Sequence, residues 1–216
     1  MGDIFREIDE ELKQEDYVRL WKKYGNHITA VLVAILLVIG GVLLWNRYQA
    51  DQREKASNRY AEAQSLAASG KKEDAAALFA SIAEQMGGGY HALSELQRAS
   101  LRASSGDEAG AIAIYDTIAA DPGIDRPLRD LATVLSVLHA LDMPRPDLPA
   151  LDGRLAPLDV ADAPWRHSAR ELRAMLAQKG GDTARAKQLY TQLSDDVDAP
   201  EGIRARAAEM LGTLGS

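Results

Sequence analysis

The sequence predicts an all-α protein in which one N-terminal transmembrane helix precedes an α-solenoid of paired helices. One observation is a run of eighteen residues, 28–45, that contains no charged side chain. The other is a spaced pattern of Gly, Ala and aromatic residues in the 171 residues that follow the run. We therefore expect three regions: a short amphipathic segment at 1–27, the transmembrane helix at 28–45 and a helical repeat domain at 46–216.

The first segment is short and rich in both signs of charge. Its apolar residues Ile4, Phe5, Ile8 and Leu12 recur at the spacing of one helical face. Five Lys and Arg against seven Asp and Glu leave the segment with a charge of −2. This pattern predicts a short amphipathic helix that faces solvent or lipid headgroups.

The apolar run has the length and the flanks of a membrane span. As a helix it is about 27 Å long, close to the hydrocarbon thickness of a bilayer. Trp21 and Tyr24 precede it, and Trp45 and Tyr48 close it, as aromatic residues do at membrane interfaces. We therefore expect contact with membrane lipid between Ile28 and Trp45.

Three alternatives bear on this run. A buried core helix would need protein on every side, and a cleaved signal peptide would need an earlier start and an A-x-A-like site. Ala30 and Ala34 could let a second membrane helix approach closely, but small residues at this spacing are common by chance, and contact with lipid is the better interpretation. Lys and Arg are equally numerous near both ends, so charge does not orient the helix.

A repeat of Gly, Ala and aromatic residues follows the span. Gly70, Gly106 and Gly181 each have an Ala seven positions before and another five positions after. Aliphatic residues stand at eight and twelve positions after each glycine, and an aromatic residue stands at nine. The glycine suits the turn after one helix, and the small Ala lets the next helix pack closely against it. This pattern predicts helix hairpins that stack into a solenoid.

The pattern and the positions of proline and glycine predict four pairs and a closing helix. Residues 143–164 hold five of the eight prolines, so the third pair has a degenerate second helix. The expected helices are 56–68 with 73–85, 90–104 with 107–120, 127–141 with a short helix at 148–155, 164–179 with 183–193, and finally 200–214. The spacing resembles the tetratricopeptide repeat, whose period is about 34 residues. A non-repeating bundle with coincidental Ala and Gly is the alternative.

Composition and motifs point away from an enzyme. No cysteine is present, the histidines His27, His91, His139 and His167 are isolated, and no nucleophile, metal or phosphate-loop motif occurs. Gly87–Gly89 lies between two predicted helices and suits a turn between repeats better than an anion-binding loop. The carboxylate pairs stand at helix starts, where they oppose the positive helix end, and this explains them without acid–base catalysis. We expect no catalytic residue, cofactor, metal or small-molecule substrate. The net charge of −7 also argues against nucleic acid.

Candidate partner-binding residues come from solenoid geometry. Exposed positions on the first helix of each pair should line a concave surface. These positions include Asn58, Glu62, Ser94, Arg98 and Arg102. A merely solvated polar face is the alternative for each of them.

Four segments resemble a bacterial family of ancillary SecYEG translocon subunits, which are single-span proteins with tetratricopeptide repeats. They are RLWKKYGNHITAVL, LLWNRYQADQREKASNRYAEA, YHALSELQRA and APWRHSARELRAMLAQKGGDTARAKQLY. The resemblance implies the bacterial inner membrane, a cytoplasmic N-terminus and a periplasmic repeat domain. It also implies translocon subunits and periplasmic chaperones as protein partners. The prolines of residues 143–164 depart from a regular repeat.

The leading hypothesis is a non-enzymatic, membrane-anchored scaffold that links the Sec translocon to periplasmic chaperones. The alternative is a membrane-tethered regulator that binds and restrains a signalling protein or envelope enzyme. A hidden enzyme is a third hypothesis, but it has no cluster of catalytic residue types behind it.

Overall fold

A computed structural model describes the backbone of residues 3–215 and the side chains of residues 22–25 and 29–215. This part of the chain is helical and has no strand, which confirms the predicted all-α fold. The chain divides into two compact units, Met1–Lys55 and Ala56–Ser216. The predicted amphipathic face of Ile4, Phe5, Ile8 and Leu12 lies outside the described side chains.

The first helix, α1, runs without interruption over Asp3–Ala68. Its part from Lys22 onward contains an apolar stretch long enough to cross a membrane, and none of that stretch is buried inside the structure. Thr29 is a polar residue of the stretch, and its Oγ1 donates to the Gly25 carbonyl at 2.8 Å. The helix is therefore compatible with a single-pass membrane anchor, and its exposed side chains do not fit a protein-buried core helix.

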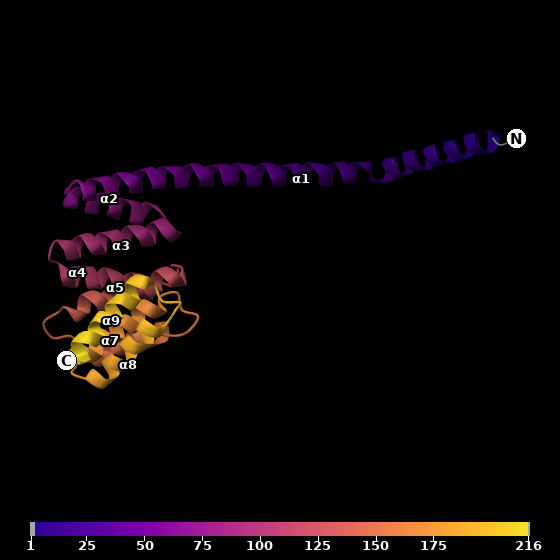
Figure 1. Ribbon diagram of the computed structural model, residues 1–216. Helices are drawn as coiled ribbons and strands as arrows, with labels where there is room; N and C mark the ends of the chain where they lie inside the picture. Colours follow the sequence, from indigo (N-terminus) through magenta and orange to yellow (C-terminus); the bar gives the residue numbers. More distant parts are fainter. Residues whose placement is uncertain (1–2, 216) are drawn as a thin grey trace. The chain divides into compact units, whose positions relative to one another are not determined.

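The remaining helices form the repeat unit in Figure 1. They are α2 Lys72–Gln85, α3 Gly88–Ser104, α4 Glu108–Ala120, α5 Arg126–Leu141, α6 Leu148–Leu155, the 3₁₀ turn η1 Ala156–Leu158, α7 Arg166–Lys179, α8 Thr183–Asp195 and α9 Glu201–Gly215. The predicted helix 56–68 is the last part of α1, and the other predicted helices of the repeat unit have ends within two residues of the predicted ones. Differences of this size are ordinary at helix ends, which fray.

Glycine ends the first helix in three of the pairs. Gly70, Gly106 and Gly181 have φ angles of 82°, 86° and 82°, the left-handed region that glycine occupies at little cost. At Gly106 the backbone amide donates to the Ala103 carbonyl at 2.9 Å, and the next amide, of Asp107, donates to Arg102 at 2.9 Å. These two bonds satisfy the last carbonyls of α3 and reverse the chain into α4.

The Ala and aromatic positions of the repeat form the core between paired helices. The alanines at five positions after the glycines, Ala75, Ala111 and Ala186, are fully buried, with 0% of their surface exposed. The aromatic side chains at nine positions after are also buried; they are Phe79, Tyr115 and Tyr190. The repeat pattern therefore identifies the side chains that pack between the two helices of these three hairpins.

The third unit keeps its second helix in shortened form. Leu151 and Leu155 of α6, together with Leu158 of η1, are buried in one core with α5 and α7. The Asp147 carboxylate accepts from the Ala150 amide at 3.1 Å and so caps α6. The prolines shorten this helix without opening a gap between α5 and α7.

The first helices of the pairs lie on the inner side of the stack. We call α3, α5, α7 and α9, with residues 56–68 of α1, the first helices, and α2, α4, α6 and α8 the second helices. Among the described elements, α3 contacts α5, α5 contacts α7 and α7 contacts α9, whereas second helices make no contact of that extent with one another. In a curved stack, the helices on the concave side lie closer to the corresponding helices of the neighbouring pairs. The first helices therefore line the concave side.

A candidate binding groove on the first helices

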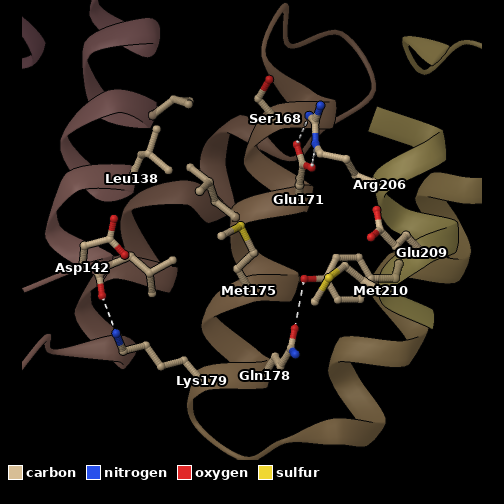
Figure 2. Close-up of a pocket in the computed structure, with 14 residues that line it drawn as sticks. Leu138, Asp142, Ser168, Glu171, Met175, Gln178, Lys179, Arg206, Glu209 and Met210 are labelled. Carbon is tan, nitrogen blue, oxygen red and sulfur yellow. Dashed lines mark hydrogen bonds and ion pairs between the residues drawn. The ribbon is translucent and has the colours of Figure 1, made fainter. Parts of the chain in front are cut away.

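A groove of about 760 Å³ lies between the first helices α5, α7 and α9, with part of α8 at its edge. Figure 2 shows Leu138 on one wall, Met175 in the middle and Met210 on the other wall. The groove is therefore on the concave side of the repeat unit, where solenoid proteins present their binding surfaces. Fourteen residues line it.

The floor of the groove is apolar because each helix contributes the residues of one helical face. Val134, Leu138 and Leu141 recur at four and three residues on α5, and Leu172 and Met175 recur at three on α7. Leu138 keeps 38% of its surface exposed, whereas the other two on α5 are buried. The floor is thus a partly exposed extension of the core, and the flexible Met side chains can adapt to different contacts.

Charged and polar side chains form the rim. Arg206 of α9 donates to both carboxylate oxygens of Glu171 on α7, at 2.7 and 2.9 Å. This hydrogen-bonded pair raises the pKa of Arg206 above its usual range. Burial raises the pKa of Tyr190, whose hydroxyl donates to Gln178 at 3.3 Å. Both groups therefore keep their protons at neutral pH.

The groove has a net negative formal charge. The Lys179 Nζ donates to the Leu141 carbonyl at 2.6 Å, where α5 and α7 both end. Helix C-termini have partial negative charge. Asp142 and Glu209 line the groove, and neither makes an ion pair within the described part of the chain. Three acids against two bases, the latter already engaged, give the groove a formal charge of −1.

The sequence-predicted candidates lie elsewhere on the first helices, and none of them lines this groove. Asn58 and Glu62 are exposed on α1. Arg98 pairs with Glu95 at 2.6 Å, and Arg102 pairs with Asp107 at 3.0 Å. Both arginines are thus engaged locally.

Ser94 requires a correction. We expected it at an exposed position, but the structure buries it completely, and its Oγ has no hydrogen-bond partner among the described atoms. The reason is that α3 packs between α2 and α4, so two of its faces are covered. Simple first-helix geometry assumes only one covered face.

The groove residues escaped the sequence reasoning for a related reason. They belong to α5, α7, α8 and α9, whereas the sequence-predicted candidates belong to the first two pairs. The sequence does contain one signal for the groove. Leu138, Met175 and Met210 are apolar although the repeat pattern does not require an apolar residue at their positions. Only the side-by-side arrangement of α5, α7 and α9 shows that they meet.

An ion-pair network fixes α6 and the following turn to α7 and α8. Asp159 accepts from Arg170 at 2.9 Å and from Arg173 at 2.7 Å. Asp152 accepts from Arg173 at 2.9 Å and from Arg185 at 2.8 Å. Burial alone would raise the pKa of Asp152, but the hydrogen bonds from the two arginines outweigh it and lower the pKa. The network therefore stabilises the degenerate unit.

The histidines whose side chains are described have structural neighbours. His139 stacks on Tyr115 with ring centroids 5.6 Å apart, and its Nδ1 lies 2.7 Å from Glu108 Oε2. The Nε2 of His167 lies 3.1 Å from Asp196 Oδ2. Among the described residues, no group of three or more His, Cys, Asp or Glu side chains could hold a metal ion.

Comparison with known proteins gives one result. A family model described as a tetratricopeptide repeat-like domain matches residues 19–210. No curated protein and no solved structure matches the chain.

Proposed function

The chain belongs to the tetratricopeptide repeat-like domain family, and from this premise we propose that it is a non-enzymatic scaffold that binds a protein partner in the groove between α5, α7 and α9. This repeat fold is typically a protein-interaction domain without catalysis. The observation that supports the proposal most directly is the partly exposed apolar floor on the concave side. Such a surface gains stability when a partner covers it.

We further propose that the protein is a single-pass anchor in the bacterial inner membrane. Residues 1–27 would be cytoplasmic, residues 28–45 would span the membrane and residues 46–216 would lie in the periplasm. The exposed apolar stretch of α1 supports the span, and the resemblance to ancillary translocon subunits supports the orientation. A tether of this kind raises the local concentration of a weakly binding domain near its partner.

The proposed partners are translocon subunits and periplasmic chaperones that receive emerging chains. Their support is the resemblance of the four sequence segments to ancillary translocon subunits. Asn58, Glu62, Arg98 and Arg102 are proposed as further contacts where a large partner extends past the groove toward the first two units. In this proposal the domain supplies a surface and no chemistry.

Site-specific photo-crosslinking in intact membranes tests the proposal. A crosslinking amino acid replaces Leu138 in the groove of the full chain, and the matched control replaces Leu93 on α3. The two side chains are similarly exposed, at 38% and 39%, and Leu93 does not line the groove. We expect translocon or chaperone subunits to be captured from Leu138 and not from Leu93.

Equal capture from both positions, or none from Leu138, would contradict binding in the groove. Capture of a signalling protein or envelope enzyme from Leu138 would support the regulator alternative. Deletion of residues 2–27, with the span kept, gives a second readout. A periplasmic scaffold keeps its crosslinks after this deletion, whereas a partner bound on the cytoplasmic side loses them.

A further inference from the structure

The charges of the groove restrict which protein segment can occupy it. Both cations on its rim are already engaged, Arg206 by a bidentate pair with Glu171 and Lys179 by the Leu141 carbonyl. An acidic ligand would have to displace one of these contacts. The carboxylates of Asp142 and Glu209 are exposed and make no ion pair among the described residues, so a cationic ligand gains two new partners.

The two acids that make no ion pair among the described residues lie on opposite walls of the groove. Asp142 follows the C-terminus of α5, and Glu209 lies on α9 near Arg206 (Figure 2). The C-termini of α5 and α7 meet beside Asp142, where Lys179 Nζ donates to the Leu141 carbonyl and already offsets the partial negative charge of the helix ends. A ligand that crosses the groove from α5 to α9 therefore meets one of these acids on each side.

The apolar floor restricts the shape of the ligand. Leu138, Met175 and Met210 come from three successive first helices and form a row across the groove (Figure 2). A ligand that contacts all three needs an apolar stripe that crosses the helices. The stripe of an amphipathic helix meets this need, with apolar residues at every third or fourth position.

We propose, on the basis of the scaffold function above, that the groove binds an amphipathic helical segment of a protein partner with Lys or Arg at both ends of its apolar stripe. The apolar stripe lies on Leu138, Met175 and Met210. One basic residue of the segment lies at Asp142 on the α5 side, and another lies at Glu209 on the α9 side (Figure 2). This assigns a specificity to the concave surface, because an acidic segment of equal hydrophobicity is rejected.

Fluorescence anisotropy with the full chain in lipid nanodiscs tests this assignment. The probe is a labelled helical peptide with a leucine stripe and lysines at both ends of the stripe. A matched peptide has glutamate in place of each lysine, and a scrambled peptide breaks the stripe. We expect the lysine peptide to bind most tightly and its affinity to fall as salt is raised, because exposed charges are screened.

Variants of the groove locate the interaction. Asp142→Asn and Glu209→Gln should each weaken binding of the lysine peptide by about twofold to fivefold, as for exposed ion pairs. They should also reduce its dependence on salt. The matched control is Glu84→Gln, which removes an exposed acid on the second helix α2 and should leave the affinity unchanged.

Several outcomes overturn the inference. These are equal or tighter binding of the glutamate peptide, unchanged affinity in Asp142→Asn and Glu209→Gln, or a dimer of the chain that Leu138→Gln abolishes while no peptide binds. Partner capture from Leu138 in membranes would survive each of the first two results. Failure of the charge assignment is thus distinguishable from failure of the proposed scaffold function.

Discussion

At the scale of single residues, three glycines determine where the helix hairpins turn. Their φ angles are near 80°, which costs an L-residue with a Cβ about 1–2 kcal/mol. A Cβ added at Gly106 would meet no neighbouring atom within 4 Å. Backbone conformation is therefore the reason for glycine at this position, and steric crowding is not.

We expect Gly106→Ala to lower the free energy of unfolding by roughly 1–2 kcal/mol. The control is Gly153→Ala on the exposed side of α6, where φ is ordinary and no atom lies within 4 Å of the added Cβ. That substitution should be neutral or stabilising by up to about 1 kcal/mol, because alanine favours helices. Urea unfolding of the two variants measures both effects, and equal destabilisation would contradict the role assigned to the turn.

The carboxylate of Asp152 is the second residue-scale feature with a measurable consequence. Its pKa is lower in the folded chain than the unfolded value of about 3.9, because Arg173 and Arg185 stabilise its charged form. A lowered pKa gives stability that is fully present above the unfolded pKa. That stability is lost as the pH falls through the folded pKa.

Asp152→Asn should therefore lower the unfolding free energy at pH 7 by about 1–2 kcal/mol. Below about pH 4 the difference in unfolding free energy between the variant and the unsubstituted chain should shrink, because the Asp152 carboxylate of the unsubstituted chain then becomes protonated and loses its charge. Denaturant unfolding at several pH values between 7 and 3 measures the difference. A constant difference at every pH would show that Asp152 acts by packing and that its charge has no part.

At the scale of elements, small side chains set how closely paired helices approach. Ala111 of α4 is fully buried, in one core with Ala99 of α3. A larger side chain at Ala111 must push these two helices apart or adopt a strained rotamer. The close helix packing therefore depends on alanine at this position.

We expect Ala111→Leu to destabilise the repeat domain by about 1–3 kcal/mol through overpacking. Ala113→Leu, two residues away on the exposed face of α4, should change the stability by less than about 0.5 kcal/mol. Thermal unfolding by circular dichroism distinguishes the two variants. Equal melting temperatures would mean that the hairpin tolerates wider spacing than its sequence pattern indicates.

At the scale of the whole molecule, the proposed function needs the chain to stay in the membrane. None of the apolar stretch of α1 is buried by other parts of the described structure. Transfer of such a stretch into lipid is favourable because its apolar side chains leave water, and the helix keeps its backbone hydrogen bonds satisfied there. The scaffold proposal places the repeat domain beside the membrane for this reason.

Alkaline extraction of membranes should leave the full chain in the pellet. The double variant Leu36→Arg with Ile39→Arg should move it to the soluble fraction, since each charge at the middle of a span costs about 3 kcal/mol. The matched variant Leu36→Ala with Ile39→Ala keeps the stretch uncharged and should remain in the pellet. Release of the unsubstituted chain by alkali would contradict the anchor and the tethered scaffold together.

The helices were largely predictable because their signals are local. Proline, glycine and the apolar period act within a few residues, so the ends of α2 to α9 lie within two residues of the prediction even at the degenerate α6. The buried alanines and aromatic residues follow the same logic, because a hairpin joins residues close in the sequence. The burial of Ser94 was not predictable in this way, because it depends on two neighbouring helices at once.

The sequence by itself determined that the described chain is helical, where its hairpins turn, which side chains fill them and that one stretch is apolar enough to span a membrane. The tertiary structure alone decided that Leu138, Met175 and Met210 form one surface and that Asp142 and Glu209, which make no ion pair among the described residues, line the same groove. The physical reason is separation along the chain. A groove between α5, α7 and α9 depends on how successive hairpins stack, and no local pattern of residues specifies that arrangement.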